Sequence, residues 1–470
     1  MTFHPHSLAL AAALVAASPM AAAASSGPAC MIWSAPEAIR SLADKRVDPF
    51  YVEVGIDGAG RAILLYSEAR AGTKKEQTVY ARHRSAEGVW GDPVPLSHIV
   101  GDQGSFVWAT HLKLSVGASG HALASWRPEV SLDYAWQSPG MAAYAPDTGW
   151  QTPVEPLDPD NSSTPPSLAV GPDGRGLAVW PATPFADNQL RARAWDPATG
   201  WGPDELVETS LARARGPKLA VNAHGQALLT YELNYSDVYA RFRSADGAWS
   251  PPRRLTRRNG HNWDTQMNPQ PAFNASGDAW VAWSDRQSRV YRVTVSSFDR
   301  NTRKWLEEPV QLSEPDEDAI DPVLRLNEQG QMLLGWYQIW GLGKERAQSR
   351  LYTPTQGWAP VTDLSRRGRS FGAPGVALDE AGNATTVWRQ ITPGENWHLH
   401  VLAQPMGAPA VDGRLHDHQR TSGLGARWFW KMADSEGRHA ILAFTRPVRG
   451  SSGEGRELVS QVGRLGDCPP

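Results

Sequence analysis

Two sets of side chains in this 470-residue chain could bind a ligand. The first set is aromatic and consists of five tryptophans in or beside segments whose length varies between repeats: Trp108, Trp136, Trp263, Trp340 and Trp397. Exposed indole faces stack on the apolar face of a sugar ring or on another protein. Each indole could instead only cover its own loop. Because all five fall on one expected face, we interpret them as binding residues.

The second set is charged and follows the second strand of several repeats. The residues assigned to ligand binding are Arg127, Asp285, Arg286, Arg389 and Arg446, and Glu68, Arg70, Glu129 and Glu232 hold related positions. Arginine forks onto carboxylate or sulfate groups, so this set predicts an anionic ligand. The alternative is a solvated rim of charges that pair with one another.

Catalytic roles stay unassigned, because a general acid or base needs a partner and a shifted pKa that sequence does not show. Candidates would be Glu68, Glu232, Asp285 and His261. The acidic stretch 314–321 offers Asp316, Asp318 and Asp321 to calcium but lacks the glycine and the terminal glutamate of the usual loop. No zinc-binding spacing, phosphate-binding glycine motif or G-x-S-x-G element occurs. We expect neither metal nor cofactor.

These side chains are positioned by a repeat that occurs eight times. A glycine is followed six residues later by an aromatic residue, or seven later in the last copy, and the anchor glycines are Gly60, Gly120, Gly174, Gly225, Gly277, Gly330, Gly382 and Gly437. Successive anchors lie 51 to 60 residues apart. A period near 50 indicates a propeller or a solenoid.

Each anchor is typical of a tight hairpin. Asp or Asn stands three residues before six of the glycines, and glycine closes such a turn because it accepts positive φ. Five copies carry a proline eight residues before the glycine, where it could begin a strand. A third strand follows, and a fourth carries a tryptophan in six copies: Trp90, Trp150, Trp201, Trp249, Trp305 and Trp358. Four strands make one propeller blade.

The eighth repeat ends without a fourth strand, whereas residues 30–39 at the other end match the fourth-strand pattern through Trp33 and Pro36. We therefore predict an all-β, eight-bladed β-propeller over residues 30–468 whose N-terminal strand completes the last blade. This arrangement places Cys30 beside Cys468, the only cysteines, and predicts a disulfide. The alternatives are free thiols or a lipid-modified Cys30.

The turn between third and fourth strands reads SADGAW at 244–249 and SAEGVW at 85–90. It resembles a degenerate Asp-box, or BNR, turn of the sialidase-like propellers. The resemblance implies the propeller architecture over nearly the whole chain. It transfers no catalytic residue, because no copy has the full motif and the catalytic sialidases have six blades.

The net charge and the apolar segments of the chain limit the classes of partner that we expect. The net charge of −3 comes from 46 basic and 49 acidic residues that are well mixed, so nucleic acid is excluded as an expected partner. Residues 1–24 are typical of a signal peptide with an A-x-A site, and no later segment has the length of a membrane span. We expect a secreted or periplasmic monomer without a transmembrane segment.

The function we expect is that of a non-catalytic, lectin-like binding propeller for a glycan or an exported protein partner. Its rivals are an exported glycoside hydrolase or polysaccharide lyase and a structural module of the cell envelope. Specificity should lie on the face of the variable connections, because loops on a rigid scaffold carry binding functions.

Overall fold

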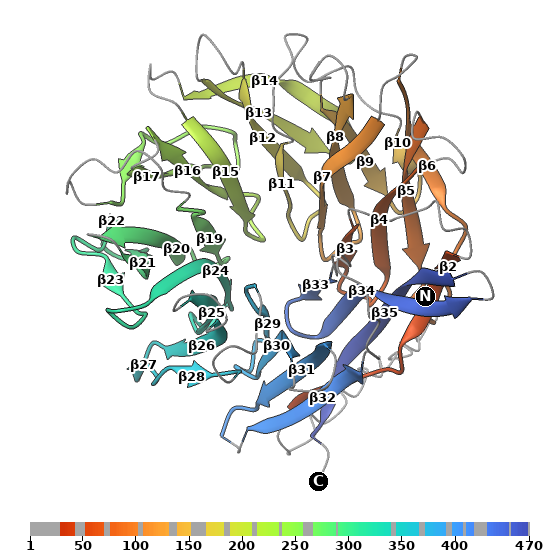
Figure 1. Ribbon diagram of the computed structural model, residues 1–470. Coiled ribbons are helices and arrows are strands. Elements are labelled where there is room, and N and C mark those ends of the chain that lie inside the picture. Colours follow the sequence, from red (N-terminus) through yellow and green to blue (C-terminus); the bar gives the residue numbers. More distant parts are fainter. Residues whose placement is uncertain are drawn as a thin grey trace, which may run out of the picture.

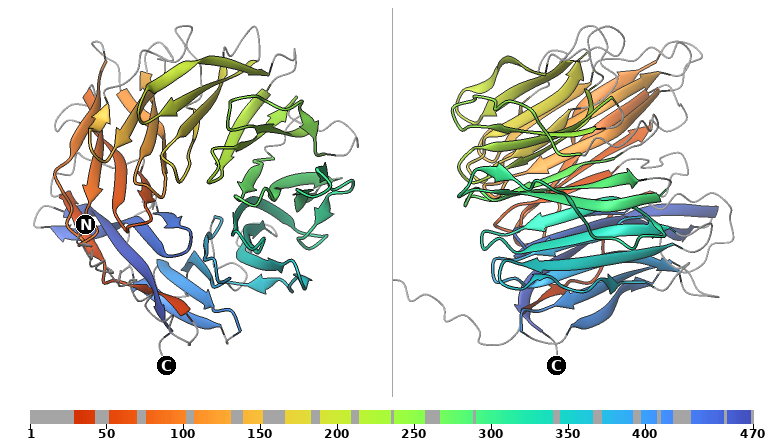
Figure 2. Two further views of the ribbon diagram at one scale, coloured as in Figure 1. Left: turned by 180° about the vertical axis from the view of Figure 1, so that it is seen from behind. Right: turned by 90° about the vertical axis from the view of Figure 1, so that its left-hand side faces the viewer.

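The computed structural model describes residues 29–42, 52–69, 76–101, 107–130, 139–151, 166–182, 189–208, 214–234, 237–256, 267–287, 290–339, 345–365, 372–391, 397–407, 410–417, 430–450 and 453–468. Eight antiparallel sheets stand in a ring (Figure 1), which confirms the predicted eight-bladed propeller. Figure 2 shows the same ring from behind and edge on. The described part contains no helix that is long and apolar enough to cross a membrane.

Each blade is a sheet whose first strand lies nearest the ring axis (Figure 1). Blade 1 contains β3 (Val52–Ile56), β4 (Ala62–Ala69), β5 (Glu76–Arg84) and β6 (Val94–Val100). Blade 2 contains β7 (Val107–Val116), β8 (Ala122–Val130), β9 (Gly140–Ala145) and β10 (Gly149–Gln151). Blade 3 contains β11 (Ser167–Val170), β12 (Gly176–Ala182), β13 (Gln189–Asp196) and β14 (Gly200–Glu208). Blade 4 contains β15 (Ala214–Val221), β16 (Ala227–Leu233), β17 (Asp237–Arg243) and β18 (Arg253–Arg254).

The other four blades repeat this order, with small additions at the outer edge. Blade 5 contains β19 (Gln270–Phe273), β20 (Ala279–Gln287), β21 (Val290–Asp299), β22 (Lys304–Trp305) and β23 (Val310–Gln311). Blade 6 contains β24 (Asp318–Leu326), β25 (Met332–Ile339), β26 (Arg346–Thr353), β27 (Gly357–Trp358) and β28 (Thr362–Asp363). Blade 7 contains β29 (Gly375–Leu378), β30 (Ala384–Ile391), β31 (Trp397–Gln404) and β32 (Val411–Asp417). Blade 8 contains β33 (Trp430–Ser435), β34 (His439–Gly450), β35 (Gly453–Asp467), β1 (Ala29–Trp33) and β2 (Glu37–Leu42).

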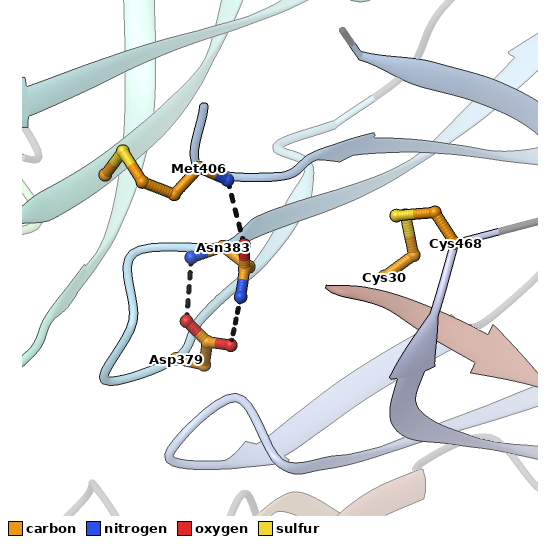
Figure 3. Close-up of a disulfide and its surroundings, with 5 residues drawn as sticks. All are labelled: Cys30, Asp379, Asn383, Met406 and Cys468. Carbon is orange, nitrogen blue, oxygen red and sulfur yellow. Dashed lines mark hydrogen bonds between the residues drawn. A yellow bond between two sulfur atoms is a disulfide. The ribbon is translucent and has the colours of Figure 1, made fainter. Parts of the chain in front are cut away.

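The ring closes as the sequence predicts. β1 and β2 pair antiparallel with β35, so the N-terminal segment supplies the outer edge of blade 8. A disulfide joins Cys30 in β1 to Cys468 directly after β35 (Figure 3). The first strands of neighbouring blades also contact one another all the way round the axis, including β33 with β3.

The anchor glycines close the turns between first and second strands. In blade 1 the amides of Ala59 and Arg61 donate to Asp57 Oδ1 (2.9 and 2.8 Å), and Gly60 has φ = 80°. All eight anchor glycines have positive φ. The predicted turn chemistry is therefore confirmed in blade 1, but it is wrong for Asp434 in blade 8. There the turn opens at Ser435, whose carbonyl oxygen accepts from the Arg438 amide, and the Asp434 carboxylate accepts from Arg325 Nε (2.6 Å). We call the face that carries these turns the turn face and the opposite one, where second strands end and first strands begin, the loop face.

Asparagines in these turns also connect blades, a role that sequence reasoning missed. Their side-chain Nδ2 atoms donate to a carbonyl oxygen of the next blade: Asn222 to Asn274, Asn274 to Asn327 and Asn327 to Asp379. Blades 2 and 3 have Gly117 and Gly171 at this position. A Cβ on Gly117 would lie 2.5 Å from the Gly171 carbonyl oxygen, so the blades approach too closely there for a side chain.

The core lies between blades. Leu64 and Tyr66 of blade 1 pack with Ile441 of blade 8, and Leu65 of blade 1 packs in another cluster with Trp126 of blade 2. The anchor aromatics are at most 3% exposed: Tyr66, Trp126, Trp180, Tyr231, Trp283, Trp336, Trp388 and Phe444. The predicted packing role of these rings is confirmed, because large apolar side chains fill the wedge between adjacent sheets.

The prolines correct one expectation. Pro166, Pro269 and Pro374 directly precede β11, β19 and β29, but Pro217 and Pro322 lie inside β15 and β24. The register of each of these two strands shifts at the proline, between Arg215 and Lys218 and between Ile320 and Val323. A β-bulge leaves a residue out of the ladder, so a proline there costs no hydrogen bond.

Candidate functional site

Two of the predicted charged positions on the loop face are occupied by ion pairs within the fold. In blade 2, Arg127 is buried and its Nη2 lies 3.3 Å from Glu129 Oε1, which also accepts from Thr110 Oγ1 (2.8 Å). Burial lowers the pKa of Arg127, and the adjacent Glu129 opposes that shift. Arg127 therefore belongs to a paired, partly buried cluster.

Glu232 in blade 4, a candidate acid or base, is held in the same way. Its buried carboxylate accepts from Arg215 Nε and Nη2 (2.9 Å each) and from the backbone amide of Asn268 in the next blade (2.9 Å). Charge-assisted hydrogen bonds of this kind are strong and hold a carboxylate in place. Glu232 thus joins blade 4 to blade 5 and positions the entry to β19.

Blades 5 and 7 carry the arginines Arg286 and Arg389. The guanidinium carbon of Arg286 lies over the ring of Tyr291 at 5.4 Å, and both side chains are half-buried. Burial lowers the pKa of Arg389 and raises the pKa of Tyr337, in the neighbouring blade, to about 12. Asp285 precedes Arg286 in β20 and is half-buried.

The remaining predicted residues are only partly placed. Trp108 is the second residue of β7, Trp397 begins β31, and Arg446 lies in β34 opposite Glu457, but their side chains lie outside the described part. Residues 136, 261, 263 and 340 lie outside the described residues altogether. The binding role of the five tryptophans therefore remains a prediction.

Backbone irregularities cluster where first strands begin on the loop face. His111, Gly216, Asn268 and Asp321 have φ between 45° and 58°, and the registers of β7, β15 and β24 shift at or directly after three of them. Left-handed backbone is uncommon outside glycine and costs free energy, and bulges re-aim the side chains that follow. All four residues lie nine positions before an anchor glycine, and this shared spacing is the signal by which the sequence could have revealed them.

The side chains that follow two of these bulges form a charged group that sequence reasoning missed. Lys113 and Lys218 occupy the same position in β7 and β15: each pairs with the residue just before the anchor aromatic of its blade. Glu53 in β3 and Lys431 in β33 hold this position in blades 1 and 8, and Lys431 Nζ bonds Glu53 Oε1 (2.9 Å).

These charges act on one another near the ring axis. The pKa of Lys218 falls to about 8, first because of burial and then because of the charge on Lys113, with Lys431 adding to the shift and Glu53 and Asp321 opposing it. Neither the Lys113 nor the Lys218 side chain has a hydrogen bond or ion pair among the described residues. In the sequence, the shared position of these four charged residues becomes visible only when the eight repeats are aligned on their anchor glycines.

Two cavities lie on the turn face, at equivalent places between blades. One, of about 300 Å³, separates blades 1 and 2 and is lined by Arg61, His83 and Tyr144 among others. The other, of about 340 Å³, separates blades 3 and 4 and is lined by Arg175, Trp195 and Arg243 among others.

His83 in the first cavity is an uncharged hydrogen-bond acceptor. Trp150 Nε1 donates to His83 Nε2 (2.7 Å), and burial lowers the pKa of His83 to about 4. We expected function on the loop face, so these cavities stand apart from the predicted site.

Two carboxylates of the acidic stretch 314–321 accept hydrogen bonds from neighbouring strands and turns. Asp318 Oδ1 accepts from the amide of Tyr291 (2.8 Å), and Asp321 Oδ1 accepts from Asn268 Nδ2 (3.4 Å). Within the described ranges, no three His, Cys, Asp or Glu side chains are placed to hold a metal ion together.

Comparison with known proteins yields similarity of fold only. No protein-family model and no curated protein matches the sequence, so the Asp-box resemblance stays a prediction. Among solved structures, a prolyl endopeptidase is 11% identical, with a TM-score of 0.48 over 86% of this chain and 56% of its own length. This chain thus spans just over half of that enzyme.

Two further similar structures are carbohydrate-related proteins. A lectin from Burkholderia pseudomallei is 11% identical, with a TM-score of 0.46 over 77% of this chain and 98% of the lectin. An ulvan lyase bound to its saccharide is 11% identical, with a TM-score of 0.43 over 73% of this chain and 90% of the lyase.

Proposed function

We propose that this chain is an exported, non-catalytic binding propeller whose loop face recognises a glycan or an exported protein partner. The disulfide between Cys30 and Cys468 supports export, because disulfides persist in oxidising compartments. The eight-bladed ring supplies a rigid scaffold on which variable connections can carry specificity.

The observation that carries the proposal is the pairing of two loop-face carboxylates with groups of the fold. Glu232 is held by Arg215 and by the Asn268 amide, and Glu129 by Arg127 and Thr110. A general acid or base must reach its substrate, and these two carboxylates are already engaged as hydrogen-bond and ion-pair partners within the fold. Glu232 also links blade 4 to blade 5, the blade that carries Arg286 and Tyr291.

The pair of Arg286 and Tyr291 is the part of the loop face best suited to a saccharide. An aromatic ring stacks on the apolar face of a sugar, while a guanidinium donates to its hydroxyl or acidic groups. Both residues come from adjacent strands, β20 and β21, so the scaffold presents them together.

The test is binding of the full chain to immobilised glycans and anionic polysaccharides, with Arg286→Ala and an exposed matched control, Arg253→Ala in β18. We expect at least one glycan class to bind, Arg286→Ala to weaken it about tenfold, and Arg253→Ala to leave it unchanged. Absence of binding by folded protein across the whole panel would overturn the glycan proposal. Release of reducing ends or unsaturated products from a bound polysaccharide would establish the hydrolase or lyase alternative instead.

A further inference from the structure

Lys113 and Lys218 are placed alike by their strands. Each is the first residue to resume the ladder after a β-bulge, opposite Ser125 in β8 and Thr230 in β16 respectively. They belong to blades 2 and 4, so both flank blade 3, whose residue at the same position is Ser167, opposite Val179. Two lysine-bearing strands, β7 and β15, therefore flank and contact a hydroxyl-bearing strand, β11, next to the ring axis.

Among the described residues, the carboxylates around this pair bond other groups. The carboxylates that act on Lys218 are those of Glu53, which bonds Lys431 Nζ, and Asp321, which accepts from Asn268 Nδ2. The described residues offer neither Lys113 nor Lys218 a direct acceptor. Two half-buried cations that repel each other raise the free energy of the protein, and a bound anion relieves both the repulsion and the loss of hydration.

We infer that the ligand of the proposed binding function is an anionic glycan, one of whose sulfate or carboxylate groups lies near the ring axis between Lys113 and Lys218. The inference rests on that proposed function and names its ligand class. Lysine ammonium groups act as compact point charges with three donors each, which suits an oxyanion approached from two sides. Two lysines suit a single substituent, whereas a nucleic-acid backbone needs a longer basic track.

The experiment measures binding of the full chain by calorimetry, using a sulfated oligosaccharide, a uronate oligosaccharide, a neutral oligosaccharide of equal length, and inorganic sulfate. The variants are Lys113→Gln with Lys218→Gln, and a control with the same loss of charge at exposed positions, Arg253→Gln with Lys304→Gln. We expect the first pair to weaken binding of the anionic oligosaccharides at least 30-fold and the control pair to change it less than threefold. Circular dichroism verifies that both fold.

A second readout needs no loss of the side chain. Lys218 is charged below a pKa of about 8, among Lys113, Lys431, Glu53 and Asp321, so anionic ligand should bind more weakly at pH 9.5 than at pH 7. The variant Lys218→Arg stays charged at pH 9.5 and should keep most of its affinity there, which a merely structural lysine would not show.

The outcomes separate the two proposals. Equal binding of neutral and anionic oligosaccharides, unchanged in the double variant, would overturn the anion site and leave the binding function standing. Lysine-dependent binding of inorganic sulfate without binding of any glycan would keep the anion site and overturn the glycan function. Absence of both would overturn both.

Discussion

Asn274 donates from its side-chain Nδ2 to the carbonyl oxygen of Asn327 (3.0 Å), one blade further round the ring. Its Oδ1 meanwhile accepts from the amide of Asp278 within its own turn (2.9 Å). Asn222 and Asn327 repeat both bonds, so a hydrogen-bonded belt links blades 4 to 7 on the turn face. It ends at Asp379, whose carboxylate instead binds Asn383 (Figure 3).

Because of this belt, we expect Asn274→Asp to lower the free energy of unfolding by about 1–3 kcal/mol at pH 7. The new carboxylate can still accept the hydrogen bond within the turn, but it cannot donate one to the buried carbonyl oxygen of Asn327. Denaturant unfolding measures the change. Asn301→Asp, in an exposed turn, is the matched control and should alter stability by less than about 0.5 kcal/mol. Equal stabilities of the two variants would show that the belt bond contributes nothing.

We predict that a side chain at Gly117 would clash where blades 2 and 3 contact each other. A Cβ there would lie 2.5 Å from Gly171 O and 2.8 Å from Val170 Cγ1, so Gly117→Ala must push the blades apart. We expect a loss of about 1–3 kcal/mol. Gly91→Ala is the control, since its Cβ would meet only His83 O at 3.7 Å. A Gly117→Ala protein as stable as the Gly91→Ala protein would refute the close approach.

We predict that the folded protein loses stability in mild acid because of His83. Its folded pKa of about 4 lies below the usual value of 6.5, so the unfolded chain takes up the proton first as the pH falls. This contribution is intact above pH 6.5 and is lost between there and pH 4, by up to about 2 kcal/mol for a half-buried group. The variant His83→Phe copies Phe242 at the equivalent position of blade 4 and should depend less on pH. Unfolding titrations at pH 7 and pH 4.5 compare the two proteins, and parallel pH profiles would contradict the assignment.

We predict that the disulfide stabilises the closed ring. Cys30 and Cys468 are 438 residues apart, so their bond restricts almost the whole unfolded chain. Replacing both with serine should lower the free energy of unfolding by about 3–5 kcal/mol in the chain-entropy description. Thermal unfolding of the variant, and of the native protein with and without reductant, measures the effect. A melting temperature that is the same in all three samples would show that the hydrogen bonds of β1 and β2 close the ring unaided.

The architecture was predictable because its determinants are local. Asp57 and Gly60 specify one turn, Trp126 and its equivalents specify one packed strand, and repetition of these short patterns counts the blades. The absent fourth strand after residue 465 and the surplus strand at residue 30 then left one way to close the ring. Hydrophobic alternation and turn chemistry need no knowledge of distant residues.

The candidate site was less predictable. The positions of Arg127 and Glu232 were identified, but their partners Glu129, Arg215 and Asn268 depend on strand register and on the neighbouring blade. Pro217 and Pro322 were expected to begin strands, because a bulge inside a strand has no distinct local signature.

By itself the sequence determined the number of blades, the hairpins within them and the meeting of the two chain ends, since each depends on residues close together in a repeating pattern. Only the tertiary structure decided that Asn274 reaches the next blade and that Lys113 and Lys218, 105 residues apart, share an electrostatic environment. Such relationships arise when the ring closes, because the spacing of blades around the axis is set by packing between sheets.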